Sequence, residues 1–273
     1  MTVATSNKLQ PDWAIIIYMV VLHLVALTAF LPGTFSWSAV GVALFLHWVT
    51  GGLGITLGFH RLVTHRSFQT PKWLEYFLVF CGTLSCQGGP IDWVGMHRIH
   101  HLHSDQTLDP HDSNQGFWWS HMGWMLHDLP IRSEVPRFTK DINSDPVYVF
   151  LQNYFIPIQV ALGVLLYLIG GWPFVVWGIF VRIVAVFHCT WLVNSATHQF
   201  GYRTYESGDR STNCWWVAVL TYGEGWHNNH HAYQHSARHG MKWWEIDLTW
   251  MTIQLLQRLG LATKVKLVDQ NEA

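Results

Sequence analysis

The sequence predicts an all-α membrane protein with four transmembrane helices and a helical cap on the cytosolic side. Of its 273 residues, 50% are hydrophobic, 12% are charged and 17 are tryptophan, whereas an ordinary soluble domain has about 25% charged residues. Four apolar runs approach or exceed the ~20 residues that cross a hydrocarbon core as a helix. They are 13–31, 37–59, 148–169 and 173–193.

The first apolar run follows a start that carries one basic residue, Lys8, and it lacks a clear small-residue cleavage site. We therefore expect a retained anchor and not a signal peptide. The net charge of −1 argues against a nucleic-acid partner, because proteins that bind nucleic acid usually carry an excess of basic residues. The four cysteines form no CxxC pair, so reduced thiols are expected.

The basic residues predict the orientation in the membrane. If all four runs cross, the connections at 32–36 and 170–172 lie on one side and contain no Lys or Arg. All of the 16 basic residues except Arg182 then lie on the other side, with both termini and the long segment 60–147. The positive-inside rule makes that side cytoplasmic.

The stretch 73–87 is too short for a further crossing and carries Glu75, so it is expected to lie at the interface or beneath a site. The whole chain, 1–273, is predicted to form one integral-membrane domain. Its cap comprises 60–147 and 194–261, the part at 102–147 being a structured connection.

Histidine is concentrated in three short strings, HRLVTH, HRIHH and HNNHH. In HxxHH, spacings of three and four residues place all three imidazoles on one face of a helix. Eight imidazoles exceed the needs of one zinc ion or one haem, so the count indicates two metal ions. The eight are His60, His65, His97, His100, His101, His227, His230 and His231.

Two redox metals held by neutral imidazoles beside a membrane suit the activation of O2 next to a lipid chain, which favours iron. Imidazole also suits zinc and copper, so the ligand type alone does not decide. Glu224, Asp105 and Asp109 are candidates for carboxylates that orient an imidazole through its second nitrogen; a helix-capping role explains them equally well. Histidines expected to have ordinary core or surface roles are His23, His47, His103, His111, His121, His127, His188, His235 and His239.

Longer strings surround these histidines in a fixed order. They are HRLVTHRSF at 60–68, WVGMHRIHHLHSD at 93–105, DPHDSNQGFWWSHMGW at 109–124, TWLVNSATH at 190–198 and GEGWHNNHH at 223–231. From about residue 40 to 260 the chain resembles the membrane-bound fatty acid desaturases of the Δ9 (stearoyl desaturase) type, in their bacterial acyl-lipid form.

The resemblance implies O2-dependent Δ9 desaturation of a saturated C16 or C18 acyl chain at a non-haem centre of two iron ions. It implies nine histidine ligands, the ninth being His198 in NSATH, and an asparagine, Asn194, that reaches one metal through water. No catalytic residue beyond the metal centre is implied. The distribution of the histidines between the two irons stays open.

The C–H bonds attacked are unactivated, so the reaction site depends on where the acyl chain is held. The resemblance implies a bent tunnel for that chain. Trp48 and Gly52, four residues apart on the second predicted helix, are expected at its floor, where Gly52 sets the depth; the alternative is a close-packing glycine. The bend is expected to be lined by Gln87, Trp93, Thr190 and Trp191.

The animal acyl-CoA enzymes of this family carry basic residues for the coenzyme A phosphates. The matching positions here are Asn114 and Gln115, with Gly95 and Met96 just before the second histidine string. Because phosphate recognition rests on Arg or Lys, we expect the acyl group to arrive on a membrane glycerolipid.

The chain carries no cytochrome b5 domain and no flavin or nicotinamide fingerprint, so an external electron donor is expected. In the bacterial and cyanobacterial relatives that the resemblance implies, the donor is ferredoxin. If the protein is cyanobacterial, an inner or thylakoid membrane is expected. Arg132, Arg137 and Lys140 are candidates for its docking patch. The positive-inside rule explains the same residues without a partner.

Two alternatives to desaturation remain open at this point. A membrane hydroxylase of the same superfamily uses the same histidine pattern and differs in its product, which gains one oxygen where a desaturase product loses two hydrogens. A membrane protein that binds haem or transports metal would instead bury its histidines within the spans, whereas these strings flank the spans.

Overall fold

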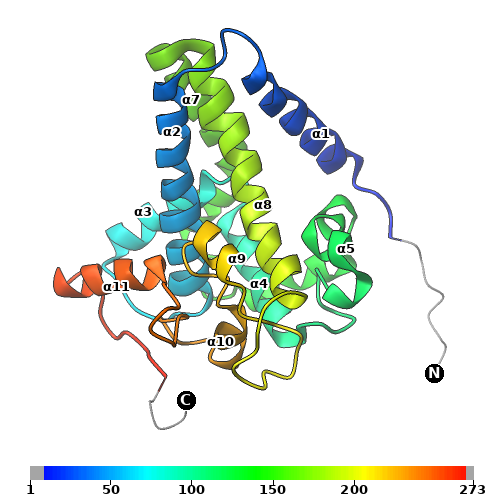
Figure 1. Cartoon of the computed structure of the whole chain (residues 1–273), viewed down its shortest axis with the longest axis vertical. Coiled ribbons are helices and arrows are strands. Elements are labelled where there is room, and N and C mark those ends of the chain that lie inside the picture. The colour runs from blue at the N-terminus through cyan, green and yellow to red at the C-terminus, as the bar shows by residue number, and fades with distance from the viewer. Residues whose placement is uncertain (1–8, 269–273) are drawn as a thin grey trace.

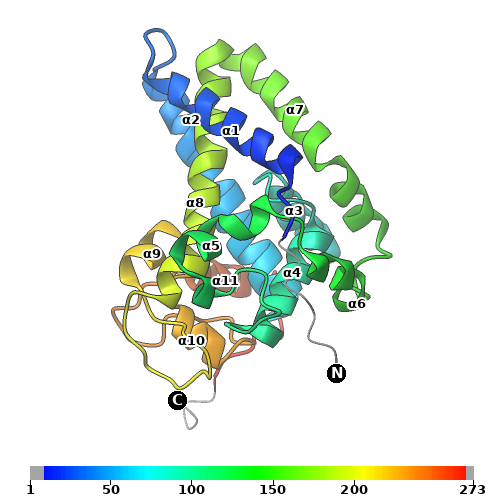
Figure 2. The same ribbon diagram turned by 90° about the vertical axis from the view of Figure 1, so that its right-hand side faces the viewer.

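The structure, a computed structural model, describes residues 9–268. Within that range the regular elements are all helical, and no β-strand is present (Figure 1). The long helices extend from one end of the molecule, and the shorter helices gather at the other end (Figures 1 and 2).

Three helical segments of the described residues are long and apolar enough to cross a membrane: Trp13–Phe30, Trp37–Thr64 and Pro146–His198. Large apolar side chains such as Leu24 and Phe30 point outward, as lipid contact requires. The elements of these segments are α1 (Trp13–Leu27), η1 (Thr28–Phe30), α2 (Trp37–His47), the π-helical η2 (Trp48–Thr64), α7 (Pro146–Val175), the π-helical η6 (Val176–Val181), α8 (Arg182–Ser195) and η7 (Ala196–His198).

Side-chain caps explain where these helices begin. The carboxylate of Asp12 accepts from the backbone N–H of Ile15 at 3.1 Å before α1, and the hydroxyl of Ser36 accepts from Ala39 at 3.1 Å before α2. Asp145 caps α7 in the same way. Each cap satisfies a backbone donor that the first helical turn leaves free.

The third and fourth predicted spans lie in one helical segment, Pro146–His198. Its backbone leaves the helical conformation at Gly171, where φ is 66° and ψ is −160°. Glycine adopts this left-handed conformation without steric cost. The segment therefore has two arms, and Figure 2 shows both descending from a common upper end.

Shorter helices occupy the remainder of the described chain. The predicted interfacial stretch 73–87 contains helix α3, whose Trp73 and Phe77 are exposed. The connection at 102–147 contains several short helices. These elements are α3 (Lys72–Thr83), α4 (Pro90–His103), η3 (Ser113–Gln115), α5 (Phe117–His121), η4 (Gly123–Leu126), η5 (Pro130–Glu134), α6 (Val135–Phe138), α9 (Trp215–Leu220), α10 (His227–Ala232) and α11 (Leu248–Arg258).

Helix α3 packs directly against η2. A Cβ atom added to Gly54 on η2 would lie 2.4 Å from the backbone nitrogen of Gly82 on α3. The two backbones thus touch, which only glycine permits. Phe59, Leu78 and Val79 continue this contact as part of the buried core. The close approach anchors η2, which carries the first histidine string.

We expect Gly54→Ala to destabilise the protein by about 1–3 kcal/mol or more, because overpacking here meets rigid backbone. Gly41→Ala on α2 is the matched control, since a Cβ there meets nothing within 4 Å; it should be neutral or slightly stabilising. Thermal unfolding of both variants in detergent measures the difference. Equal melting temperatures would contradict the contact.

Candidate metal centre

Four elements bring the predicted histidines together. His60 lies in the last turn of η2 and His65 directly follows it; the backbone N–H of His65 donates to the carbonyl of His60 at 3.1 Å, the five-residue spacing of a π-helix. Helix α4 carries the second string, α10 carries the third, and η7 ends at His198.

The nine histidines form two groups, and within each group the ligand atoms lie within 4.8 Å of one another. Neighbours in sequence separate: His100 and His101 join different groups, as do His230 and His231. Adjacent residues on a helix point about 100° apart, so each HxxHH string serves both groups. The five-histidine group is His60, His65, His97, His101 and His230; the four-histidine group is His100, His198, His227 and His231.

The spacing of the ring nitrogens fits metal ions. In the five-histidine group, the Nε2 atoms of His97 and His101 are 3.0 Å apart, those of His101 and His230 are 3.0 Å apart, and those of His230 and His60 are 3.1 Å apart. Metal–nitrogen bonds of about 2.1 Å at right angles separate neighbouring nitrogens by about 3.0 Å.

The four-histidine group leaves buried nitrogens without partners. Nε2 of His100, of His198 and of His231 is buried and makes no hydrogen bond. A buried polar atom without a partner costs about 1–3 kcal/mol, and a metal ion would supply the missing interaction. The donor set of each group therefore fits a metal ion.

Burial keeps several of these imidazoles neutral. It lowers the pKa of His97, His101, His227 and His230 well below the usual value. Neighbouring histidines lower it further. A neutral imidazole is the form that binds a metal, so the site is ready for coordination near neutral pH.

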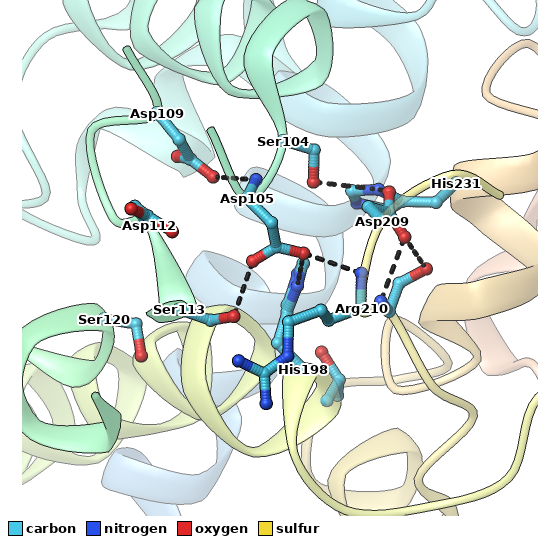
Figure 3. Close-up of polar contacts among 12 residues, drawn as sticks. Ser104, Asp105, Asp109, Asp112, Ser113, Ser120, His198, Asp209, Arg210 and His231 are labelled. Atoms are coloured by element: carbon cyan, nitrogen blue, oxygen red, sulfur yellow. Dashed lines mark hydrogen bonds and ion pairs between the residues drawn. The ribbon is translucent and has the colours of Figure 1, made fainter. Parts of the chain in front are cut away.

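Three carboxylates contact Nδ1 atoms of the four-histidine group; Figure 3 shows Asp105 beside His198 and Asp209 beside His231. Nδ1 of His198 donates to Asp105 at 2.9 Å, Nδ1 of His100 donates to Asp109 at 3.0 Å, and Nδ1 of His231 donates to Asp209. Each contact leaves Nε2 of the ring directed toward the group and fixes the orientation of the ring.

Asp105 is held in turn. Its Oδ1 accepts from the hydroxyl of Ser113 and its Oδ2 from the backbone N–H of Arg210 at 2.8 Å (Figure 3). Burial alone would raise the pKa of Asp105, but the hydrogen bond and charge of His198 hold it well below its usual range. The carboxylate is therefore ionised at neutral pH.

The five-histidine group has a different surrounding. Its carboxylate contact is between Nδ1 of His60 and Glu224, at 2.8 Å. Glu224 also accepts from the guanidinium of Arg61 at 2.9 and 3.0 Å, and Arg61 bonds Asp247 at 2.9 Å. Among the described residues, no Lys or Arg forms an ion pair with the three aspartates of the other group.

Several residues of the centre escaped the sequence interpretation. Asp209 lies in a loop, where no regular spacing links it to the histidines. Arg61 belongs to the string HRLVTH, but that pattern does not indicate a structural role for it. The sequence predicts an ordinary core or surface role for His239, yet its Nδ1 is 3.1 Å from Glu224 and its ring lies 4.3 Å from that of His230. The ring of His111 likewise lies close to that of His100, with ring centres 4.2 Å apart.

Two cavities meet beside the histidines. We call the one that reaches His47 and Gly51 the inner cavity and the one that reaches Tyr18 on α1 the outer cavity. The outer cavity encloses about 1490 Å³ and the inner about 550 Å³, both including open solvent. Both are lined by Trp93, His97, Thr190 and Asn194.

The residues expected at the bend lie near this junction. The side-chain amide of Gln87 donates to the hydroxyl of Thr190 at 2.8 Å, and the indole N–H of Trp93 donates to Gln87 at 3.1 Å. Trp191 lines the outer cavity. Their role toward an acyl chain stays a prediction, as does the water bridge from Asn194.

Trp48 and Gly52 lie elsewhere. They line a third hollow with Leu248 and Leu255 of α11, which we call the lipid-side hollow, and neither residue lines the inner cavity. Their placement as the tunnel floor stays a prediction.

The positions matched to coenzyme A contacts are occupied by internal interactions. Asn114 bonds the backbone carbonyl of Asp105 at 2.8 Å and accepts from Arg210 at 3.0 Å. Gly95 has no room for a longer side chain, because a Cβ there would lie 2.7 Å from Val135. Neither position offers a cation to a phosphate.

Comparisons with known proteins agree with this geometry. Residues 35–260 match the family model described as fatty acid desaturase. The chain is 73% identical to an sn-1 stearoyl-lipid 9-desaturase of Anabaena variabilis, over 100% of both chains. It is 64% identical to a protein of the same name from Synechocystis sp., over 98% of this chain and 85% of that one. It is 51% identical to an sn-2 palmitoyl-lipid 9-desaturase of Nostoc sp., over 95% and 92%. The chain therefore belongs to the fatty acid desaturase family.

Proposed function

We propose that the protein introduces a Δ9 double bond into a saturated C16 or C18 acyl chain of a membrane glycerolipid. In the balanced reaction the acyl chain loses two hydrogen atoms. O2 combines with these two hydrogen atoms, with two electrons from the donor and with two protons, and two water molecules form. The observation that carries the proposal is the convergence of two histidine groups beside two cavities: His97 of the five-histidine group lines both, and His227 of the four-histidine group lines the inner one. The names of the similar cyanobacterial proteins support the lipid-linked substrate.

The two groups would hold one iron ion each, through five and four imidazoles. When bound, the irons would supply the O2 chemistry needed to remove hydrogen from unactivated C–H bonds. Residues of the chain itself orient the ligands. The carboxylates of Asp105, Asp109 and Asp209 accept hydrogen bonds from the Nδ1 atoms of three histidines in the four-histidine group. Asn194, at the junction of the cavities, fits a water-mediated contact.

Regioselectivity would follow from where the acyl chain is held. The hydrogen-bonded set Gln87, Thr190 and Trp93 stands where the two cavities meet, so it would bend the chain there. The carboxyl half then lies in the outer cavity and the methyl half in the inner cavity. A fixed bend beside the metals selects the ninth carbon by its distance from the carboxyl end.

We propose four membrane crossings, with the two arms on either side of Gly171 crossing separately. The cap, both termini and the metal centre would then face the cytoplasm, in an inner or thylakoid membrane; the distribution of the basic residues supports this orientation. The chain acts as one domain. Helix α3, with exposed Trp73 and Phe77, suits the interface.

Electrons would come from ferredoxin or a similar acidic donor. Arg132, Arg137 and Lys140 are all exposed, which suits a docking patch. Attraction between opposite charges speeds such encounters at low ionic strength.

Expression in a host that lacks Δ9 desaturation tests the function directly. Gas chromatography with double-bond location should find Δ9 products, and loss of two hydrogens separates desaturation from hydroxylation. His101→Ala should abolish product because it removes one ligand of the five-histidine group. His103→Ala, on the same helix but outside both groups, is the control. Unaltered lipids from an iron-loaded, donor-supplied wild type would refute the proposal.

The metal centre predicts about two irons per chain after reconstitution. Asp209→Asn should weaken binding of one of them by about 10- to 100-fold, as for other partners behind a ligand. Asp128→Asn, at an exposed position, is the control. Titration of the metal-free protein with Fe²⁺, followed by elemental analysis, measures this. Two equally tight irons in Asp209→Asn would rule out the supporting role of Asp209.

Charge reversal tests the docking patch. Arg137→Glu with Lys140→Glu should lower the ferredoxin-dependent rate at low salt and flatten its salt dependence. Arg258→Glu, exposed on α11, is the control for a general change of charge. If the double variant keeps the wild-type rate and salt dependence, these residues do not dock the donor. The positive-inside rule then explains them by itself.

A further inference from the structure

Tyr222 separates the inner cavity from the lipid-side hollow. Among the described residues it is the one that lines both spaces. The inner cavity extends from the metal ligands His60 and His97 to His47 and Gly51, so Tyr222 stands at the end remote from the metal centre. An acyl chain that fills the cavity would meet this ring with its methyl end.

Two kinds of contact hold the ring in place. The Tyr222 hydroxyl and Nδ1 of His47 are hydrogen-bonded at 2.7 Å, so each satisfies the other's polar atom beside an apolar space. The backbone carbonyl of Tyr222 accepts from the N–H of Thr249 at 2.9 Å and from its hydroxyl at 3.0 Å. Breaking the tyrosine–histidine bond would leave polar groups unsatisfied.

Two consecutive glycines make room for the ring. A Cβ added to Gly51 would lie 3.3 Å from Cε2 of Tyr222, and one added to Gly52 would lie 3.5 Å from its Cδ2. The ring therefore lies across the backbone of η2 at the point where side chains are absent. Tyr222 also has a φ of 58°, a backbone conformation that is rare for a bulky residue.

The space behind the ring is open. The lipid-side hollow is lined by Met251 and Leu255, both 55% exposed, and by Trp48, 44% exposed. Its apolar lining would accept further methylenes of an acyl chain if the tyrosine ring were removed.

We propose that Tyr222, bonded to His47 across Gly51 and Gly52, is the end wall of the acyl tunnel and sets the longest chain that the enzyme accepts. This inference rests on the proposed desaturase function. It assigns the chain-length limit to a residue of the segment before α10, in addition to the second helix. Because the bend fixes the distance from the carboxyl end, the wall controls chain length and leaves the Δ9 position unchanged.

The test supplies a host with C16, C18 and C20 saturated acids and measures each Δ9 product by gas chromatography. Tyr222→Ala should raise the ratio of C20 to C18 product about tenfold or more, the scale on which a pocket discriminates methylenes. Tyr222→Phe keeps the ring and loses only the hydrogen bond to His47, so the ratio of C20 to C18 product should rise less than in Tyr222→Ala. Tyr222→Ala with Thr252→Phe, which refills the hollow from α11, should restore the wild-type ratio.

If the Tyr222→Ala protein does not accumulate, Gly51→Ala provides a second test, because this variant should shorten the preferred acyl chain instead of lengthening it. Its added methyl group enters the inner cavity against the ring, so the ratio of C18 to C16 product should fall. Unchanged ratios in whichever of these variants accumulate, with normal Δ9 products, would overturn the end-wall assignment while leaving the desaturase function intact. Absence of unsaturated product from the wild type would overturn the function itself.

Discussion

A buried ionic contact joins the parts of the molecule that must meet for a metal centre to exist. Arg61 is completely buried on η2 and donates to Glu224, to Asp247 and to the carbonyl of Ala237. It therefore ties the first histidine string to the segment that carries the third. Removal of one partner from such a buried set leaves charges uncompensated and is strongly destabilising. Glu224 also contacts His60, so the same buried contact fixes the position of a histidine of the five-histidine group.

The two histidine groups lie in unequal electrostatic surroundings. Three aspartates support the four-histidine group without a Lys or Arg paired to them in the described chain, whereas the carboxylate behind the five-histidine group is paired with Arg61. More uncompensated negative charge lies near the four-histidine position, so a cation is favoured there more strongly. Burial lowers the pKa of His97, His101, His227 and His230, so members of both groups are neutral and able to bind a metal near neutral pH.

Under the proposed function, the two cavities would recognise a substrate that has almost no polar group. A hydrogen-bonded set of three residues shapes the junction of the two cavities, and a tyrosine–histidine pair closes one end. In both places polar atoms satisfy one another and present apolar surfaces to the cavity. In the proposed tunnel, fixed walls would select a position along the acyl chain by its distance from them, because the reacting C–H bonds are chemically alike.

The sequence alone determined the helical membrane class, the histidine strings and the family resemblance, because hydropathy, i, i+3 and i, i+4 spacing and ordered motifs are local properties of the chain. It also marked Asp105, Asp109 and Glu224, although not which imidazole each would hold. Only the tertiary structure decided the division of the histidines into five and four, since this depends on how η2, α4, α10 and η7 meet. Asp209 and Tyr222 carried no signal because their partners, His231 and His47, are brought to them by folding: Asp209 lies in an irregular loop, and His47 is 175 residues from Tyr222. Contacts between distant segments depend on packing that no local spacing encodes.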